Sequence, residues 1–298
     1  MFIASMRYGP EQTSSLDDRS MIVFTDLDGS LLDHDSYRHD AAESALQRLA
    51  VLGIPCIPVT SKTREELLSI RSELNLNSPF VVENGSAVFI PENLAGFDNA
   101  GLVHPPGSDF LLQRFGREHK DVLIQLREIS AGGEYHWRGF SDMPLDEIMQ
   151  RTGLDASAAQ NASRREFCEP VVWLDDETQL SAFIATLQAH GLQAVPGGRF
   201  LHIMDAAAGK GRAVEWLCGR YLQTPACTVA LGDSGNDIDM LNAVDIAVLV
   251  RSEQHDFPQA QGRKQTLRTR SPGPAGWAEA MHQILDDWEA EQEQLKHG

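Results

Sequence analysis

Beyond a polar start, short apolar runs alternate with segments of helical periodicity. The runs at 22–25, 54–59 and 80–82 have the length of buried strands, and 41–52 and the segment after Thr63 place apolar side chains at helical spacing. Strands that alternate with helices form parallel sheets, because each helix carries the chain back to the start of the next strand. The pattern therefore predicts an α/β fold with a doubly wound, Rossmann-like parallel sheet.

The alternation is interrupted in the middle of the chain. Past Gly85 come loops rich in Pro, Gly and Asn, then amphipathic helices separated by isolated strands, and from Lys210 the regular alternation returns and runs to a terminal helix from Ala275. A length of 298 residues suits about two domains. We predict a loose lead-in at 1–20, a core domain formed by 21–90 and 205–298, and an inserted α+β domain at 91–204.

An excess of acidic side chains limits the partners of this chain. The sequence has 43 Asp and Glu against 25 Lys and Arg, a net charge of −18, which repels nucleic acid and anionic lipid surfaces. No apolar run reaches the roughly 18 residues of a membrane-spanning helix or suits a signal peptide, and the cysteines form no CxxC pair. We expect a cytoplasmic protein with no nucleic acid or membrane partner, and the sequence is silent on oligomeric state.

The first group of polar residues is Asp26-Leu27-Asp28-Gly29-Ser30, directly after an apolar strand. Open α/β sheets bind ligands at this end of their strands. Asp26 can attack phosphorus and form an aspartyl phosphate, while Asp28 can protonate the leaving oxygen and later activate water. Gly29 allows a tight turn and leaves its amide to face a phosphate oxygen. A bare pair of carboxylates after a strand is, however, more often a solvated acidic turn.

A second acidic group, Gly-Asp-Ser-Gly-Asn-Asp at 232–237, also follows a strand and opens a helix. Its carboxylates and those of Asp26 and Asp28 form an oxygen-rich set suited to Mg²⁺. We expect Asp233 to be a direct ligand and Asp237 a second ligand or anchor, while Asn236 can orient the substrate or a metal-bound water. The alternative is an ordinary helix cap, because Asp, Ser and Asn are frequent capping residues.

Two further elements complete a possible phosphate site. Thr60, followed by Ser61 and Lys62, ends the second strand, where hydroxyl and amide groups can bind a transferring phosphoryl group. Lys210 begins a helix and can neutralise the growing charge on the phosphoryl oxygens. Each residue alone is unremarkable, but the order of all four elements predicts phosphoryl transfer.

This order of motifs resembles the phosphatases of the haloacid dehalogenase superfamily, and the insertion lies where the class IIB subgroup carries an α+β cap. The resemblance implies an HAD core, a cap domain and Mg²⁺-dependent hydrolysis through an aspartyl phosphate. Further strings are similar to the mannosyl-3-phosphoglycerate phosphatases: VTSKT at 59–63, VENG at 82–85, REFCE at 165–169, GRF at 198–200 and GW at 276–277. They imply a small phosphorylated metabolite as substrate, a glycosyl-3-phosphoglycerate that is cleaved to a glycosylglycerate, a compatible solute.

The predicted cap supplies the residues for the leaving group. Arg165 and Arg199 can bind a glycerate carboxylate, and Glu166 and Glu169 can bind sugar hydroxyls. Their alternative interpretations are a solvated helix end and a hairpin turn. His202 alternates with apolar residues, so we expect it to pack beside the site.

Two other functions remain open from the sequence. One is a related enzyme, either a phosphatase for sucrose phosphate or another hexose phosphate, or a phosphomutase. The other is a binding module without catalysis, which the presence of all four motif residues (Asp26, Asp28, Lys210 and Asp233) disfavours.

Overall fold

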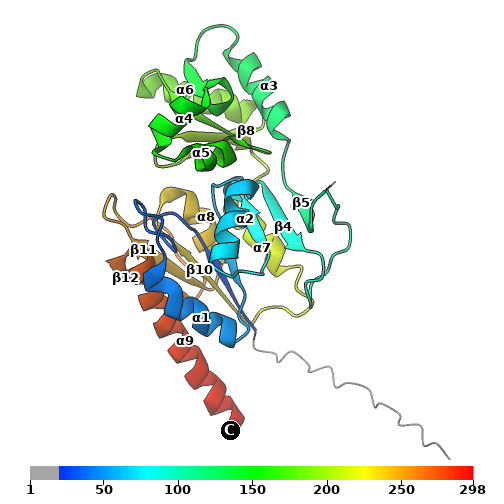
Figure 1. Ribbon diagram of the computed structural model, residues 1–298, viewed down its shortest axis with the longest axis vertical. Helices are drawn as coiled ribbons and strands as arrows, with labels where there is room; N and C mark the ends of the chain where they lie inside the picture. Colours follow the sequence, from blue (N-terminus) through cyan, green and yellow to red (C-terminus); the bar gives the residue numbers. More distant parts are fainter. Residues whose placement is uncertain (1–19, 106, 298) are drawn as a thin grey trace, which may run out of the picture.

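The computed structural model describes residues 20–105 and 107–297, so all but the last residue of the predicted lead-in at 1–20 lies outside the described residues. Strands in the described chain form three sheets (Figure 1). The largest is parallel throughout, in the order β12-β11-β10-β1-β2. Its strands are β1 (Met21–Thr25), β2 (Cys56–Pro58), β10 (Cys227–Gly232), β11 (Ile246–Arg251) and β12 (Gln265–Pro272). The predicted doubly wound α/β fold is confirmed.

Helices cover both faces of this sheet because successive strand residues point to opposite sides. Met21 and Val23 of β1 belong to one apolar cluster, and Ile22 and Phe24 to another. The first cluster includes residues of α1 (Glu43–Val51), α2 (Arg64–Glu73) and α9 (Gly273–His297). The second includes residues of α7 (Lys210–Cys218) and α8 (Ile238–Asn242).

A small antiparallel sheet extends the core domain beyond its predicted limit. It has the order β3-β4-β5, with β3 (Phe80–Val82), β4 (Ala87–Pro91) and β5 (Phe110–Arg114). Phe110 and Leu112 of β5 pack against the first cluster, and Phe97 lies in the second. The pairing of β5 with β4 therefore places β5 with the core, and the boundary predicted at residue 91 is too early.

The cap is built on a separate antiparallel sheet of order β6-β7-β9-β8. Its elements are α3 (His119–Ser130), β6 (Trp137–Gly139), α4 (Leu145–Thr152), α5 (Ala156–Ser163), β7 (Glu169–Trp173), α6 (Glu177–Ala189), β8 (Leu192–Pro196) and β9 (Leu201–Asp205). Short 3-10 helices complete the described chain: η1 (Asp40–Ala42), η2 (Glu83–Gly85), η3 (Phe140–Asp142) and η4 (Gly235–Asp237). Val171, Phe183 and Ile203 lie at the centre of the cap's own apolar core.

The two connections between core and cap lie against each other. The backbone N–H of Arg117, in the outgoing connection, donates to Asp205 Oδ2 at the end of β9, 3.2 Å away. A Cβ atom on Gly116 would lie only 2.4 Å from the Cβ of Asp205, so only glycine permits this approach. The chain therefore enters and leaves the cap at one place.

Local sequence signals position several of these elements. Thr63 and Glu66 form the capping box that begins α2, and Asp176 caps α6 by accepting from the N–H of Gln179. A hairpin across Gly197 joins β8 to β9. Strand β12 was not predicted because its polar and charged residues resemble a loop.

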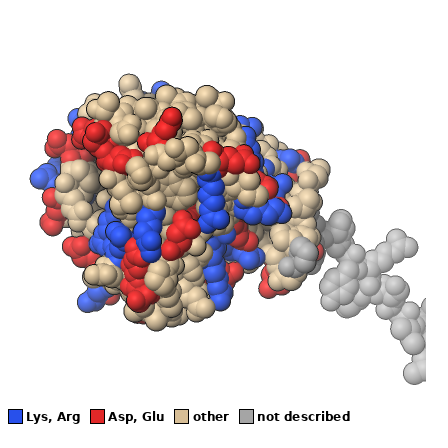
Figure 2. Space-filling model, turned by 90° about the horizontal axis from the view of Figure 1, so that it is seen from above, with Lys and Arg blue, Asp and Glu red and all other residues tan. Residues whose placement is uncertain are grey.

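The surface shows both kinds of charge. On the face in Figure 2, Lys and Arg side chains lie among Asp and Glu, and no continuous basic patch is visible among the residues drawn in colour. A search of the described residues also finds no helix with the length and apolar character needed to span a membrane.

Replacing Trp277 by Phe tests the link between the terminal helix α9 and strand β1. Trp277 is fully buried, and its Nε1–H donates to Thr25 Oγ1 at 2.9 Å, one residue before Asp26. The variant loses this bond and part of a packed ring, so its free energy of unfolding should fall by about 2 kcal/mol in urea titrations. Trp288→Phe, in a half-buried position of the same helix, should lose less; equal losses would contradict the assignment.

Candidate active site

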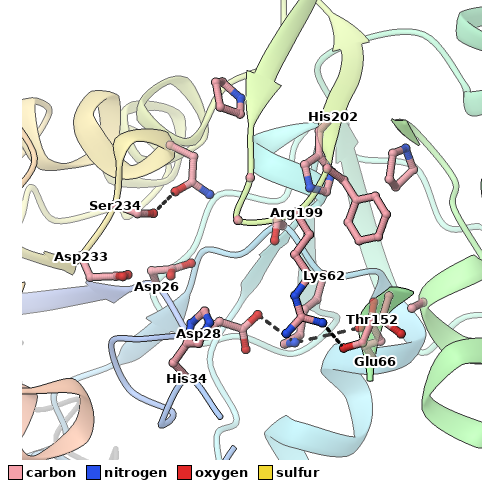
Figure 3. A pocket seen from close by; sticks show the side chains of 18 of the residues that line it. Asp26, Asp28, His34, Lys62, Glu66, Thr152, Arg199, His202, Asp233 and Ser234 are labelled. Atoms are coloured by element: carbon pink, nitrogen blue, oxygen red, sulfur yellow. Dashed lines mark hydrogen bonds and ion pairs between the residues drawn. The ribbon is translucent and has the colours of Figure 1, made fainter. Parts of the chain in front are cut away.

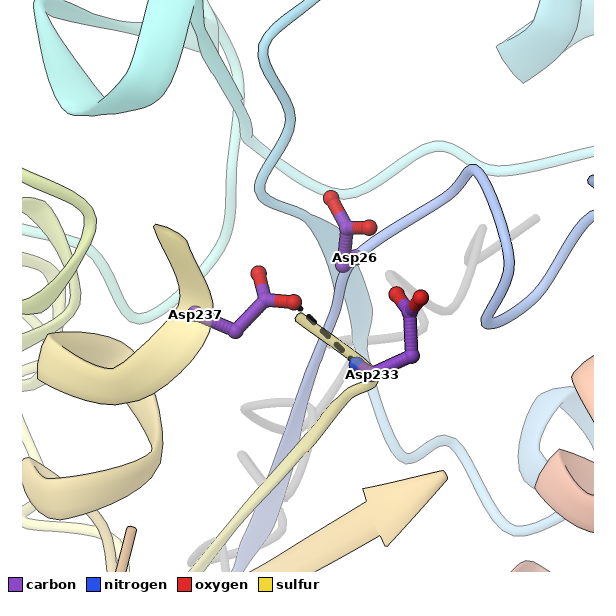
Figure 4. A group of neighbouring side chains, drawn as sticks. All are labelled: Asp26, Asp233 and Asp237. Carbon is purple, nitrogen blue, oxygen red and sulfur yellow. Dashed lines mark hydrogen bonds between the residues drawn. The ribbon is translucent and has the colours of Figure 1, made fainter. Parts of the chain in front are cut away.

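Neighbouring strands bring the two acidic groups together. β1 and β10 run parallel with Thr25 opposite Leu231, and the N–H of Asp26 donates to Leu231 O at 2.9 Å. Asp26, Asp233 and Asp237 each contribute one carboxylate oxygen to a group whose atoms all lie within 4.8 Å of one another (Figure 4). Three buried carboxylates thus converge at the carboxyl end of the parallel sheet.

Glycine makes this convergence possible. Gly29 has a φ of +79°, and a Cβ atom there would lie 2.6 Å from Asp233 Oδ2. The N–H of Gly29 donates to Leu32 O at 2.9 Å. The prediction that this amide faces a phosphate oxygen is therefore wrong, because the turn itself uses the donor. The structure assigns Gly29 a steric role beside Asp233.

Lys210 lies between two of the carboxylates. Its Nζ is 2.7 Å from Asp26 Oδ1 and 2.7 Å from Asp237 Oδ1. Burial disfavours the charged ammonium, but Asp237 and Asp26 outweigh burial and raise the pKa of Lys210 above its usual range. The other oxygen of Asp237 accepts the N–H groups of Asp233 and Ser234, each at 3.1 Å. Asp237 therefore fixes both the lysine and the loop that carries Asp233.

One ammonium does not balance three carboxylates. Burial, then repulsion from Asp237, holds the pKa of Asp26 well above its usual range despite Lys210. The same two causes raise the pKa of Asp233 to about 7. A hard divalent cation with carboxylate ligands would remove this excess charge, so the donor set fits such an ion.

Asp28 has a different environment from the other three carboxylates. Its Oδ2 pairs with Lys62 Nζ at 2.9 Å, and its Oδ1 is buried with no hydrogen-bond partner among the described residues. Figure 3 shows this pair in the cleft. The structure does not bring the carboxylate of Asp28 into the group formed by Asp26, Asp233 and Asp237. Its position suits proton transfer to a substrate better than metal binding through the side chain.

Most of the predicted phosphate-binding residues line the cleft that also exposes Asp26, and Thr60 immediately precedes Ser61 in the chain. Thr60 is buried, its N–H donates to Val81 O, and its hydroxyl accepts from the N–H of Lys62 at 3.2 Å. Ser61 lines the cleft beside Lys62. Asn236 accepts from Ser234 Oγ at 2.6 Å and lies at the edge of the same cleft.

A cleft of about 480 Å³ separates the carboxylates from the cap. Arg165, Arg199 and His202 line its cap side, as Figure 3 shows for the last two. Arg165 Nη1 donates to Ser61 O at 2.8 Å, which joins the cap to the core. Burial, then the charges of Arg165 and Lys210, lowers the pKa of His202 to about 3, so this side chain is neutral. A neutral imidazole can bind a substrate but cannot supply positive charge.

Two predicted substrate residues do not reach the cleft. Glu169 is fully buried within the cap, where its carboxylate accepts the N–H and hydroxyl of Ser141 and contacts His119 Nε2 at 2.6 Å. Glu166 pairs with Arg64 at 3.2 Å. Neither glutamate is among the residues that line the cleft. Their spacing beside Arg165 could not reveal this, because side-chain direction depends on how β7 enters the cap sheet.

Several residues that line the cleft had no clear sequence signal. Tyr37 has a φ of 56° and lies with its ring centroid 4.9 Å from Lys62 Nζ. His255, in the loop after β11, has Nε2 3.3 Å from Asp233 Oδ2. A single Tyr or His in a polar loop carries no periodicity or motif, so only the folded chain identifies these positions.

Comparison with protein families identifies the class that this fold and site define. A family model described as haloacid dehalogenase-like hydrolase matches residues 23–99, and one described as sucrose-6F-phosphate phosphohydrolase matches residues 172–284. A haloacid dehalogenase-like hydrolase structure from B. subtilis has 18% identity and a TM-score of 0.60, covering 88% of this chain and 98% of its own. A Synechocystis sucrose-phosphatase bound to sucrose and phosphate has 17% identity and a TM-score of 0.54, covering 89% and 98%. These structures share the fold.

Two curated relatives narrow the class to a family. Both are named glucosyl-3-phosphoglycerate/mannosyl-3-phosphoglycerate phosphatase. The protein from Persephonella marina is 34% identical over 275 residues, 90% of this chain and 98% of the relative. The protein from Methanococcoides burtonii is 37% identical over 266 residues, 89% and 97% respectively. The chain belongs to this family of phosphatases within the haloacid dehalogenase-like hydrolases.

The raised pKa of Asp233 predicts how stability depends on pH in metal-free buffer. Because this pKa is about 7 in the folded chain against an ordinary 3.8, the folded state binds more protons than the unfolded state between about pH 4 and 7. This carboxylate therefore lowers the free energy of unfolding as pH rises across that window, by on the order of 4 kcal/mol.

Asp233→Asn tests this dependence. In chelator-containing buffer, the variant should lose this decrease and unfold at higher urea concentration than the native chain at pH 8. Asp239→Asn is the control, because Asp239 is exposed on helix α8, which follows the loop of Asp233. If the free energy of unfolding depends on pH in the same way in the native chain and in Asp233→Asn, protonation of Asp233 does not cause the dependence.

Proposed function

We propose that this chain hydrolyses a glycosyl-3-phosphoglycerate, with mannosyl-3-phosphoglycerate as the main substrate, to glycosylglycerate and phosphate in the cytoplasm. The observation that carries the proposal is the presence of two arginines, Arg165 and Arg199, across the cleft from the carboxylate group. A phosphoglycerate glycoside has a carboxylate some distance from its phosphate, and two separate cationic regions suit a substrate with two anionic groups. The names of the two relatives support the same substrate.

In the proposed reaction Asp26 is the nucleophile. An oxygen of its carboxylate attacks phosphorus, the bond from phosphorus to the 3-oxygen of the glycerate breaks, and an aspartyl phosphate forms. Lys210 holds Asp26 at 2.7 Å and neutralises charge that grows on the phosphoryl oxygens. The hydroxyls of Thr60 and Ser61 and the amide of Asn236 surround the phosphoryl group.

Asp28 moves the proton. It donates a proton to the departing glycerate oxygen, and then accepts one from the water that attacks the aspartyl phosphate and restores Asp26. The orphaned Oδ1 of Asp28 is the atom available for this transfer, because Oδ2 is held by Lys62. Lys62 thus orients the carboxylate and adds positive charge inside the cleft.

The proposed cofactor is Mg²⁺, held by Asp26 and Asp233 with Asp237 as a ligand or anchor. Phosphatases of this class are generally metal-dependent. When bound, the ion supplies positive charge that keeps Asp26 deprotonated and draws in the phosphate. The raised pKa values of Asp26 and Asp233 support the presence of such a cation in the working enzyme.

Asp26→Asn tests the nucleophile. The amide retains the size of the side chain but cannot form the acyl phosphate, so kcat should fall by at least 10³-fold while the protein still folds. Phosphate release would measure the rate, and circular dichroism would show that the fold is retained. Asp287→Asn, at an exposed position of α9, should leave the rate unchanged. Native activity in Asp26→Asn would overturn the assignment of Asp26 as the nucleophile.

A substrate panel tests the leaving group. Phosphate release should be at least tenfold faster, in kcat/KM, from mannosyl- and glucosyl-3-phosphoglycerate than from sucrose 6-phosphate or glucose 6-phosphate, and each rate should require added Mg²⁺. The match of residues 172–284 to the sucrose-6F-phosphate phosphohydrolase family makes sucrose 6-phosphate the second candidate. Comparable slow rates on all four compounds would defeat the proposal, and transfer of phosphate to a second sugar without release would indicate a mutase.

A further inference from the structure

The turn formed by Glu83, Asn84 and Gly85 has an unusual backbone. All three residues adopt left-handed conformations, with φ values of 47°, 57° and 86°. Two of them carry side chains, which makes this conformation costly and places it among the strained segments that occur at functional positions. The turn must therefore be held by its surroundings, and its contacts show what it connects.

The side chain of Glu83 binds the cap. Its carboxylate accepts the N–H of Glu166 at 2.9 Å, of Phe167 at 3.1 Å and of Cys168 at 2.7 Å. Glu83 is fully buried, so bulk water does not compete for these hydrogen bonds. Phe167 itself packs into the core's first apolar cluster. One carboxylate of the core thus holds three consecutive amides of the cap.

The backbone of the same turn contacts the loops of the active site. The N–H of Glu83 donates to Lys62 O at 3.0 Å, and the N–H of Asn84 donates to Thr60 O at 2.9 Å. Asn84 Oδ1 accepts from Asn236 Nδ2 at 3.2 Å.

On its far side the turn abuts the residue that precedes Lys210. A Cβ atom on Gly85 would lie 2.1 Å from the carbonyl carbon of Gly209. The turn therefore contacts three separate segments of the core: the loop of Thr60 and Lys62, the loop of Asn236, and Gly209 before Lys210. Through Glu83 it joins these segments to the cap.

Arg165 is the first residue before the clamped amides. Its Nε donates to Ala162 O and its Nη1 to Ser61 O, both at 2.8 Å, so the guanidinium lies between the cap and the phosphate-binding loop. This side chain is almost fully buried and lines the cleft. Any shift of the segment at 166–168 would move Arg165 relative to the carboxylates.

We propose that Glu83 is a positioning residue that aligns the cap with the catalytic loops and so places Arg165 over the leaving group. This inference rests on the function proposed above. Two carboxylate oxygens accept three N–H groups without conflict, whereas the amide of glutamine would direct an N–H toward N–H donors. Glu83→Gln therefore breaks the set of three bonds, because one acceptor oxygen is lost, and retains the size of the side chain and the backbone bonds of the turn.

Two substrates separate positioning from folding. In Glu83→Gln, kcat/KM for mannosyl-3-phosphoglycerate should fall at least tenfold, while that for p-nitrophenyl phosphate, which has no carboxylate for Arg165, should stay within threefold. Asp245→Asn is the matched control, because Asp245 accepts the N–H and hydroxyl of Thr228 at the opposite end of the sheet. It should leave the ratio of the two rates unchanged. Equal loss on both substrates, or no loss on either, would overturn the proposal.

Hydrogen exchange tests the clamp without any assumption about the substrate. In the full-length metal-free protein, amide exchange of the peptide containing 166–168 should become at least tenfold faster in Glu83→Gln and stay unchanged in Asp245→Asn. If the native enzyme shows no preference for glycosyl phosphoglycerates, the proposed function fails but this measurement still decides the role of Glu83. Unchanged exchange in Glu83→Gln would rule the clamp out.

Discussion

Repulsion among three buried carboxylates is the constraint on which this structure depends. Asp26, Asp233 and Asp237 are brought together by the parallel pairing of β1 and β10, and glycine at position 29 leaves room for Asp233. Lys210 offsets only part of the charge. The packed apolar clusters on both faces of the sheet stabilise an arrangement that is unfavourable by itself until a cation enters. The fold thus holds three acidic side chains close together before any substrate or cation binds.

The cap places further side chains opposite the three carboxylates. Arg165 and Arg199 stand across the cleft, while His202 is kept neutral by its burial. In the proposed reaction the carboxylates of the core carry out phosphoryl transfer, and the cap residues account for the proposed choice of leaving group. The strained turn at Glu83 links the two, because one short segment contacts both the cap and the loops of the site.

Sequence patterns predicted the core more completely than the site. The strand that precedes Asp26 and the capping box of Thr63 depend on neighbours in the sequence, so their signals are local. β12 could not be recognised because only its edge position in the sheet makes its polar residues a strand. The bound amide of Gly29 and the buried carboxylate of Glu169 depend on tertiary contacts that spacing does not encode. The start of the cap was misplaced for the same reason, since β5 joins the core only through its pairing with β4.

The close approach of Gly116 to Asp205 has an evolutionary consequence. Because the chain leaves and re-enters the core at neighbouring points, the intervening segment can be lengthened, shortened or exchanged without altering the order of strands in the sheet. Changes within this segment can therefore alter the cap side of the cleft while Asp26 and Lys210 keep their places in the core. An architecture of this kind allows a different leaving group to be accommodated through changes in one insertion.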